Sequence, residues 1–320
     1  HKMKFEFFVY GNKPKGGRSL FISMHGGGNA PARVNDGQWE NQKRLYRPAE
    51  GIYVAPRAPT NTWNLWHQGH IDGLFDRLIE NFVALHDANP NRVYLMGYSA
   101  GGDGVYQLAP RMADRFAAAA MMAGHPNETS PVGLRNLPFT LHMGERDSGY
   151  NRNKVAASWK TQLANLRKAD PTGYLHHVQI HAGLGHWMNR RDAVAVPWMS
   201  KHTRNPLPER IVWKQDDVRH SSFYWLASPM NETAGRPQII ANIKNQTITL
   251  AGPAGKTVLV RLDDRLVNLN QPVVISANGK EVFRGKVTRT IGALAKTMAA
   301  RGDRYLMFGA EVTVNLPAPN

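Results

Sequence analysis

The residues best suited to chemistry lie in segment 97–101, GYSAG, which has the pattern G-x-S-x-G. A short apolar run over residues 93–96 precedes it, and a helix-compatible segment follows. This context predicts a strand that turns sharply into a helix and leaves Ser99 exposed on a strained backbone. Because the chain contains 29 glycines, an ordinary Gly-rich turn is the alternative to a serine nucleophile.

A serine hydroxyl needs a neighbouring base, and that base needs a third group to fix its tautomer. Among 13 histidines, His186 is the best candidate because it follows the last predicted strand in a glycine-flanked loop. Asp147, just beyond a strand that ends at Met143, is the predicted third group, with Glu145 as its alternative. Four other histidines fall inside predicted strands and have the ordinary structural interpretation: His142, His176, His177 and His181.

A glycine-rich segment, His25-Gly26-Gly27-Gly28, follows a predicted strand over residues 18–24. Glycines in this position place bare backbone N–H groups at the carboxyl edge of a sheet, where ligands of open α/β sheets bind. The functional interpretation is one half of an oxyanion hole. The alternative is a turn that serves connection alone.

Other loop residues are candidates for substrate binding. Trp63 and Trp66 lie in a polar and aromatic loop, where they line a substrate pocket or simply pack the loop. His125 follows another strand and either contacts substrate or anchors its loop. Tyr98 and Trp187 are candidates because they neighbour Ser99 and His186.

The elements that must position these residues alternate along the first 200 residues. Hydrophobic spacing predicts helices over residues 71–86, 100–108 (ending near Pro110) and 154–168. Short apolar runs predict the strands between them: residues 3–10, 18–24, 51–55, 93–98, 116–122, 138–143 and 176–181. This alternation predicts a mostly parallel sheet with helices on both faces.

The pattern changes near residue 205, so we expect a catalytic domain over 1–204 and a β-rich accessory domain over 205–320. Asn278-Gly279 predicts a tight hairpin, and residues 291–301 predict one helix that Gly302 ends. The second domain is therefore predicted to be a small β-sandwich-like unit. Its aromatic residues fill an interface with the first domain or form a platform for a sugar or polymer: Trp213, Phe223, Tyr224 and Trp225. The predicted strands are 210–214, 223–227, 239–243, 247–250, 257–262, 273–276, 280–287 and 305–314.

Composition limits the class of protein. The net charge of +16 is spread over both halves without a Lys/Arg-rich run, which favours general affinity for anionic surfaces over specific nucleic-acid binding. The absence of cysteine excludes disulfides and thiolate metal sites and fits the cytoplasm or the periplasm. No apolar run is long enough for a membrane span, and no signal peptide is expected at the N-terminus. A chain that starts at His1 favours a trimmed protein, periplasmic or secreted.

Four motifs in order resemble the α/β-hydrolase superfamily of serine esterases, lipases and peptidases. They are residues 25–28, 97–101, 144–147 and 185–187, and the resemblance covers about residues 3–200. The layout is most similar to the carboxylesterase/phospholipase, dienelactone-hydrolase and secreted polymer-esterase branches. The accessory domain resembles no family that we can name.

This resemblance implies an α/β-hydrolase fold and a catalytic triad of Ser99, Asp147 and His186. It implies an oxyanion hole made by the N–H groups of Ala100 and one of three glycines, Gly26, Gly27 or Gly28, with Gly27 the preferred one. The expected activity is hydrolysis of a small-molecule or polymer carboxylic ester through an acyl-enzyme, with no metal or organic cofactor. A serine peptidase and a non-catalytic binding protein on the same scaffold are the alternatives, and the oligomeric state is not predicted.

Overall fold

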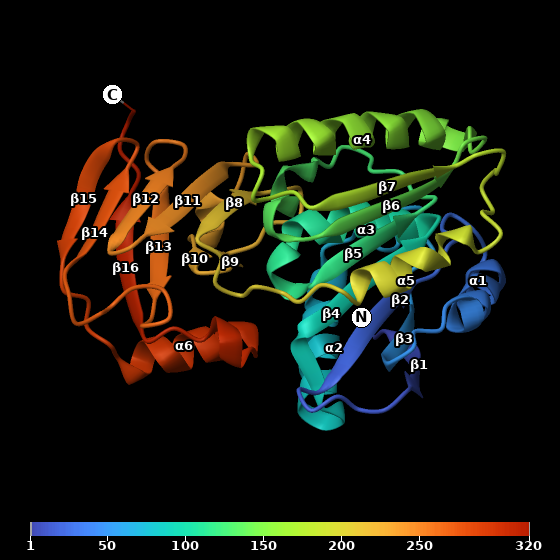
Figure 1. Cartoon of the computed structure of the whole chain (residues 1–320), viewed down its shortest axis with the longest axis horizontal. Helices are drawn as coiled ribbons and strands as arrows, with labels where there is room; N and C mark the ends of the chain where they lie inside the picture. The colour runs from blue at the N-terminus through green and yellow to red at the C-terminus, as the bar shows by residue number, and fades with distance from the viewer. Residues whose placement is uncertain (1, 320) are drawn as a thin grey trace. The chain divides into compact units, whose positions relative to one another are not determined.

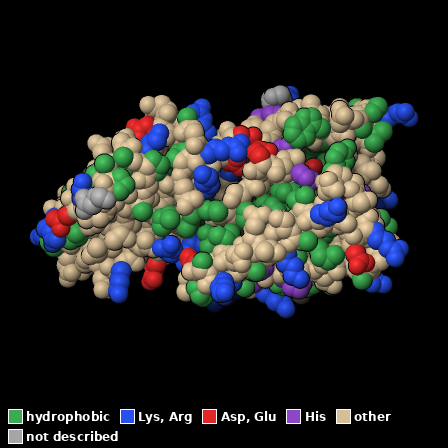
Figure 2. Space-filling model, turned by 90° about the horizontal axis from the view of Figure 1, so that it is seen from above, with side chains coloured by type: hydrophobic (Ala, Val, Ile, Leu, Met, Phe, Trp, Pro, Cys, Tyr) green, Lys and Arg blue, Asp and Glu red, His purple; other side chains and the backbone are tan. Residues whose placement is uncertain are grey.

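The computed structural model describes residues 2–319, and the chain divides into two compact units, one ending at Arg204 and one beginning at Asn205. None of the helices within residues 2–319 has the length and apolar character needed to cross a membrane. On the face drawn in Figure 2, Lys and Arg side chains are scattered rather than gathered in one band.

The first unit is built on a seven-stranded sheet with the order β1-β3-β2-β4-β5-β6-β7 (Figure 1). All neighbouring strands are parallel except β1, which pairs antiparallel with β3. The strands are β1 (Lys4–Tyr10), β2 (Arg18–Met24), β3 (Gly51–Arg57), β4 (Ala88–Tyr98), β5 (Ala118–Met122), β6 (Phe139–Gly144) and β7 (His176–His181). The predicted mostly parallel α/β sheet is therefore confirmed.

Helices cover both faces of this sheet. On one face, Trp39 and Leu45 of α1 (Ala32–Leu45) and Met199 of α5 (Ala195–Met199) pack against the strands. On the other face, aromatic contacts join the sheet to its helices: Phe7 meets Phe82, and Phe139 meets Trp159. The helices of this second face are α2 (His70–His86), α3 (Ala100–Arg111) and α4 (Arg152–Ala169).

Three features of this unit differ from the sequence-based expectation. Helix α1 was not predicted, because its sequence ARVNDGQWENQKRL has few apolar residues and its start has no side-chain cap. Strand β4 begins at Ala88, earlier than expected. Helix α3 continues through Pro110 to Arg111, although Pro110 has no N–H to donate to the carbonyl of Tyr106 one turn earlier.

The second unit contains two sheets and one helix (Figure 1). One sheet has the order β16-β13-β10-β9 and the other β15-β14-β12-β11-β8. Their strands are β8 (Arg210–Lys214), β9 (Ser222–Phe223), β10 (Leu226–Ala227), β11 (Gln238–Lys244), β12 (Thr247–Ala251), β13 (Thr257–Leu262), β14 (Val273–Ala277), β15 (Lys280–Gly285) and β16 (Ala310–Asn315). The helix, α6 (Ile291–Arg301), has the predicted bounds.

The aromatic residues of the second unit pack within it. The ring of Trp213 stacks on that of Phe223 at 6.0 Å, and the Trp225 indole N–H donates to the Pro208 carbonyl at 2.8 Å. All three side chains and that of Tyr224 are buried, so the suggestion of an open aromatic platform is wrong.

The backbones pack very closely where β4 turns into α3. A Cβ on Gly97 would collide with the main chain of Gly101, and a Cβ on Gly101 would collide with the carbonyl of Met24 on the neighbouring strand β2. Both positions therefore require glycine for close approach of backbones rather than for flexibility.

We predict that Gly101→Ala lowers the free energy of unfolding by about 1–3 kcal/mol, since the added methyl meets backbone that cannot rotate away. Gly73→Ala, inside α2 with no atom within 4 Å of the new Cβ, is the matched control and should stabilise by about 0.5–1 kcal/mol. Urea unfolding followed by tryptophan fluorescence measures both. Equal effects of the two substitutions would contradict this account of the turn.

Candidate active site

Ser99 occupies the turn between β4 and α3 with φ 57° and ψ −120°, a conformation that residues with a side chain rarely adopt. Its N–H donates to the Met122 carbonyl at 2.9 Å, and its carbonyl accepts from the Asp103 N–H at 3.0 Å. Both hydrogen bonds hold the strained backbone in place. The side chain is thus presented at the carboxyl edge of the sheet.

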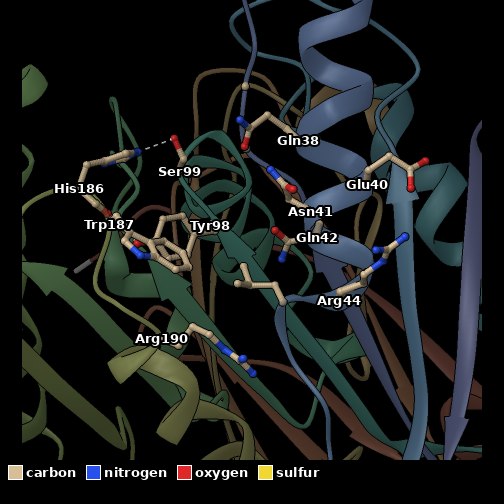
Figure 3. Close-up of a pocket in the computed structure, with 13 residues that line it drawn as sticks. Gln38, Glu40, Asn41, Gln42, Arg44, Tyr98, Ser99, His186, Trp187 and Arg190 are labelled. Atoms are coloured by element: carbon tan, nitrogen blue, oxygen red, sulfur yellow. Dashed lines mark hydrogen bonds between the residues drawn. The ribbon is translucent and has the colours of Figure 1, made fainter.

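Three side chains from distant parts of the chain meet at this edge (Figure 3). The His186 Nε2 lies 2.9 Å from the Ser99 Oγ, and the His186 Nδ1 lies 2.7 Å from the Asp147 Oδ2. A carboxylate accepts the proton on Nδ1, so Nε2 is left to accept the proton of the serine hydroxyl. The side chain of Asp147 is only 3% exposed, whereas that of His186 is 43% exposed and open to a ligand.

The loop that carries His186 is fixed from two sides. The Tyr98 hydroxyl donates to the His186 carbonyl at 2.6 Å and accepts from the Met188 N–H at 3.0 Å. Glu145, the alternative acid, accepts the Gly183 N–H at 2.7 Å. Glu145 therefore braces the loop, while the Asp147 carboxylate is the one that contacts the imidazole.

The glycine-rich loop after β2 is oriented by His25 and Asn35, both fully buried. The His25 Nε2 accepts from the Ala58 N–H at 3.1 Å, so its Nδ1 carries the proton and donates to the Gly26 carbonyl at 2.6 Å. Burial lowers the pKa of His25 to about 4, which keeps the ring neutral. Because a trans peptide points its C=O and N–H in opposite directions, this bond turns the Gly27 N–H away from His25.

The three candidate glycines of this loop differ in their hydrogen bonds. The Gly28 N–H donates to the Asn35 Oδ1 at 2.8 Å and is already used. Within residues 2–319, no hydrogen bond takes up the N–H of Gly27 or that of Ala100. Gly27 also lines both cavities beside Ser99, which makes it the best placed of the three glycines.

Two cavities share Gly27: Ser99 lines the larger one, and its neighbour Ala100 lines the smaller one. The larger, of about 900 Å³, is walled by polar residues of α1 on one side and by the His186 loop on the other (Figure 3). The smaller, of about 350 Å³, includes Ala100, Trp63 and His125. Within residues 2–204, no three His or carboxylate side chains converge closely enough to hold a metal ion.

The predicted substrate-binding residues divide into two groups. Tyr98 and Trp187 line the larger cavity, whereas Trp63 and His125 line the smaller one. His125 also anchors its loop, because its Nδ1 accepts from the Asn127 N–H at 2.9 Å. The prediction for Trp66 is wrong.

Trp66 is fully buried and lines neither cavity. Its indole N–H donates to the His25 carbonyl at 2.8 Å, and its ring meets the His25 ring edge-on. This position buries the large apolar ring and gives its one polar group, the indole N–H, a hydrogen-bond acceptor. Trp66 therefore supports the start of the glycine loop at His25.

Sequence reasoning also missed residues that line the cavities. Gln38, Asn41 and Arg44 of α1 line the larger cavity, and nothing in the weak apolar pattern of that helix indicated them. Asp103 lines the smaller cavity, and its carboxylate accepts the His125 N–H at 2.6 Å. Its place in the first turn after a nucleophile motif is the signal that could have indicated it.

Burial raises the pKa of Asp103 to about 6, so the folded state disfavours its ionised form. The contribution of Asp103 to the free energy of unfolding should therefore decrease as pH rises from about 4 to 6, because its carboxyl binds a proton more tightly in the folded state than in the unfolded state over this range. We predict that Asp103→Asn raises the free energy of unfolding by about 2–3 kcal/mol at pH 8. This gain should shrink as the pH falls towards 4. Urea unfolding of wild type and Asp103→Asn at pH 8 and pH 4 measures this gain in the free energy of unfolding. A gain that does not change with pH would contradict the raised pKa of Asp103.

The strand order, the serine at the strand–helix turn and the histidine beyond the last strand form an arrangement that is typical of the α/β-hydrolase fold. No protein-family model matches the chain. In sequence it is 27% identical over 171 residues to a poly(3-hydroxybutyrate) depolymerase of Ralstonia pickettii, a match that covers 47% of this chain and 35% of the depolymerase. This chain thus spans only about a third of that relative's length.

The solved structures that resemble this one include the following two. LpqC, a poly(3-hydroxybutyrate) depolymerase from Bordetella parapertussis, has a TM-score of 0.46 at 17% identity, over 63% of this chain and 85% of LpqC. A thermostable esterase also has a TM-score of 0.46 at 17% identity, over 63% of this chain and 59% of that one.

Proposed function

We propose that this protein hydrolyses carboxylic esters through an acyl-enzyme formed on Ser99. The observation that carries the proposal is the continuous hydrogen-bonded chain from the Ser99 hydroxyl through His186 to the buried Asp147, with steps of 2.9 and 2.7 Å. A serine so connected can lose its proton as it attacks, which an isolated hydroxyl cannot do at neutral pH.

In the proposed reaction, the Ser99 Oγ attacks the acyl carbon while the His186 Nε2 takes the hydroxyl proton. The N–H groups of Gly27 and Ala100 stabilise the developing oxyanion, and each such donor typically contributes about 10²–10³-fold in rate. When the tetrahedral intermediate collapses, the ester C–O bond breaks and His186 returns the proton to the leaving alcohol. Water then attacks the acyl-enzyme with His186 as base, releasing the acid and restoring Ser99. Asp147 holds the imidazole and stabilises its protonated form.

An ester is the proposed substrate class because the curated relative is a depolymerase of a polyester. The two cavities that share Gly27 support an ester with extended groups on both its acyl and its alcohol side. A small or polymeric aliphatic ester fits this arrangement. All the residues of the proposed mechanism belong to the first unit, and the second unit is proposed to be accessory.

The triad assignment predicts the effects of three substitutions. Ser99→Ala should abolish hydrolysis of p-nitrophenyl butyrate, and Asp147→Asn should lower kcat by about 10⁴-fold because the wrong imidazole tautomer is favoured. Glu145→Gln is the matched control: it removes a carboxylate near the same loop and should reduce kcat only a few-fold. Steady-state kinetics with unfolding curves for each variant measures this. A larger loss in Glu145→Gln than in Asp147→Asn would reverse the assignment of the acid.

Substrate panels test the ester proposal against a peptidase of the same fold. We expect wild-type protein to hydrolyse p-nitrophenyl acyl esters of short and medium length. The Ser99→Ala variant should not hydrolyse them. Peptide p-nitroanilides should be cleaved at least about 10³-fold more slowly in kcat/KM, since an anilide nitrogen is a poorer leaving group than a phenolate oxygen. Comparable turnover of both classes would favour a peptidase.

A further inference from the structure

Two arginines line the larger cavity with exposed guanidinium groups. Arg44 belongs to the last turn of α1, and Arg190 follows the His186 loop, so they come from separate walls. Both side chains are exposed, and within residues 2–319 neither guanidinium makes an ion pair or a hydrogen bond. In Figure 3 both lie in the part of the cavity away from Ser99 and His186.

The acidic groups nearby are already engaged. Glu40, the acidic residue that lines this cavity, accepts from the Lys43 ammonium at 2.7 Å. Asp192 is near enough to Arg190 to interact electrostatically, but it is fully buried and accepts the Tyr46 hydroxyl. The far end of the larger cavity therefore has an excess of positive charge, in contrast to the smaller cavity, where Asp103 and Arg152 both contribute.

Hydrogen bonds fix the backbone at one of these two arginines, Arg190. Arg190 has φ 60° and ψ 14°, a left-handed conformation, and the Arg191 N–H that follows it donates to the Met188 carbonyl at 3.0 Å. The Met188 N–H is in turn bound by the Tyr98 hydroxyl, next to the proposed nucleophile. The arginine is thus tied through two hydrogen bonds to the element that carries Ser99.

We propose that Arg44 and Arg190 bind a carboxylate on the substrate, so that the preferred substrate is an ester that carries a free carboxylate at one end. This rests on the proposed esterase function and narrows it. A guanidinium binds a carboxylate through paired, charge-assisted N–H···O bonds, and an open cavity near Ser99 allows this while the ester lies at the oxyanion hole. Every cleavage in a chain of hydroxy-acid esters leaves a new carboxylate end. Short soluble oligoesters are therefore rich in the proposed group, whereas a long neutral polymer is not.

The test compares substrates that differ only in charge. One pair is p-nitrophenyl hydrogen adipate and its methyl ester, with the carboxylate on the acyl side. The other is the linear dimer of 3-hydroxybutyric acid and its methyl ester, with the carboxylate on the alcohol side. In at least one pair, we expect kcat/KM for the acid to exceed kcat/KM for its methyl ester by about ten-fold or more. This acid-to-ester ratio should decrease as salt is added, because salt screens the charges.

Variants show whether the two arginines cause this preference. Arg44→Gln and Arg190→Gln should each lower the acid-to-ester ratio about five- to ten-fold, and Arg44→Lys should retain part of it. Arg33→Gln is the control, because Arg33 lies on the same helix outside the cavity and its loss changes the net charge equally. Thermal unfolding checks that each variant is folded.

The outcomes separate this inference from the proposed function. If neutral methyl esters are hydrolysed but neither pair shows a preference for the acid, the carboxylate site is refuted and the esterase stands. An acid preference that persists in both Arg→Gln variants, or falls equally in Arg33→Gln, also refutes it. If none of the four substrates is hydrolysed by folded wild-type protein, the esterase proposal itself is refuted.

Discussion

The arrangement of the whole site depends on one tight backbone contact, the crossing of β4, β2 and the start of α3 at Gly97 and Gly101. Because no side chain separates these backbones, the turn can place Ser99 in a left-handed conformation at the end of a central strand. The side chain of a residue held this way lies outside the sheet. The N–H groups at the N-terminus of the following helix, α3, lie beside it. Both are what a nucleophile and an oxyanion site require.

Parallel topology then explains why distant residues converge. The carboxyl ends of β2, β4, β6 and β7 lie along one edge of the sheet, so the loops that follow them are neighbours in space. Each of these strand ends is followed by one part of the site: the glycine loop, Ser99, Asp147 and His186, in that order. The supporting bonds come from the same loops: Glu145 and Tyr98 brace the His186 loop, and His25 orients the Gly26–Gly27 peptide.

The parts of the structure that were predictable are those with a strong local signal. Apolar runs separated by glycines indicated the strands. Asp147 and His186 were indicated because each follows the carboxyl end of a predicted strand, where the loops of a parallel sheet meet. Helix α1 could not be identified because its contribution is polar: Gln38, Asn41 and Arg44 face a cavity rather than a core, and cavity-facing residues have no apolar periodicity.

The prediction for Trp66 was wrong, and Asp103 was missed, for a related reason. The secondary-structure element alone, a loop for Trp66 and the helix after the turn for Asp103, does not show what each side chain contacts. The tertiary packing decides otherwise: the glycine loop covers Trp66, and the His125 loop brings its N–H to Asp103. A single sequence contains no information on which loop covers which side chain.

The central claim is that Ser99 becomes covalently acylated, and intact mass spectrometry tests it most directly. Wild-type protein quenched in acid during turnover of p-nitrophenyl butyrate should contain a species heavier by one butyryl group, which peptide mapping assigns to Ser99. Quenched protein that turns over the ester without any added mass, or with the acyl group on another residue, would contradict the account.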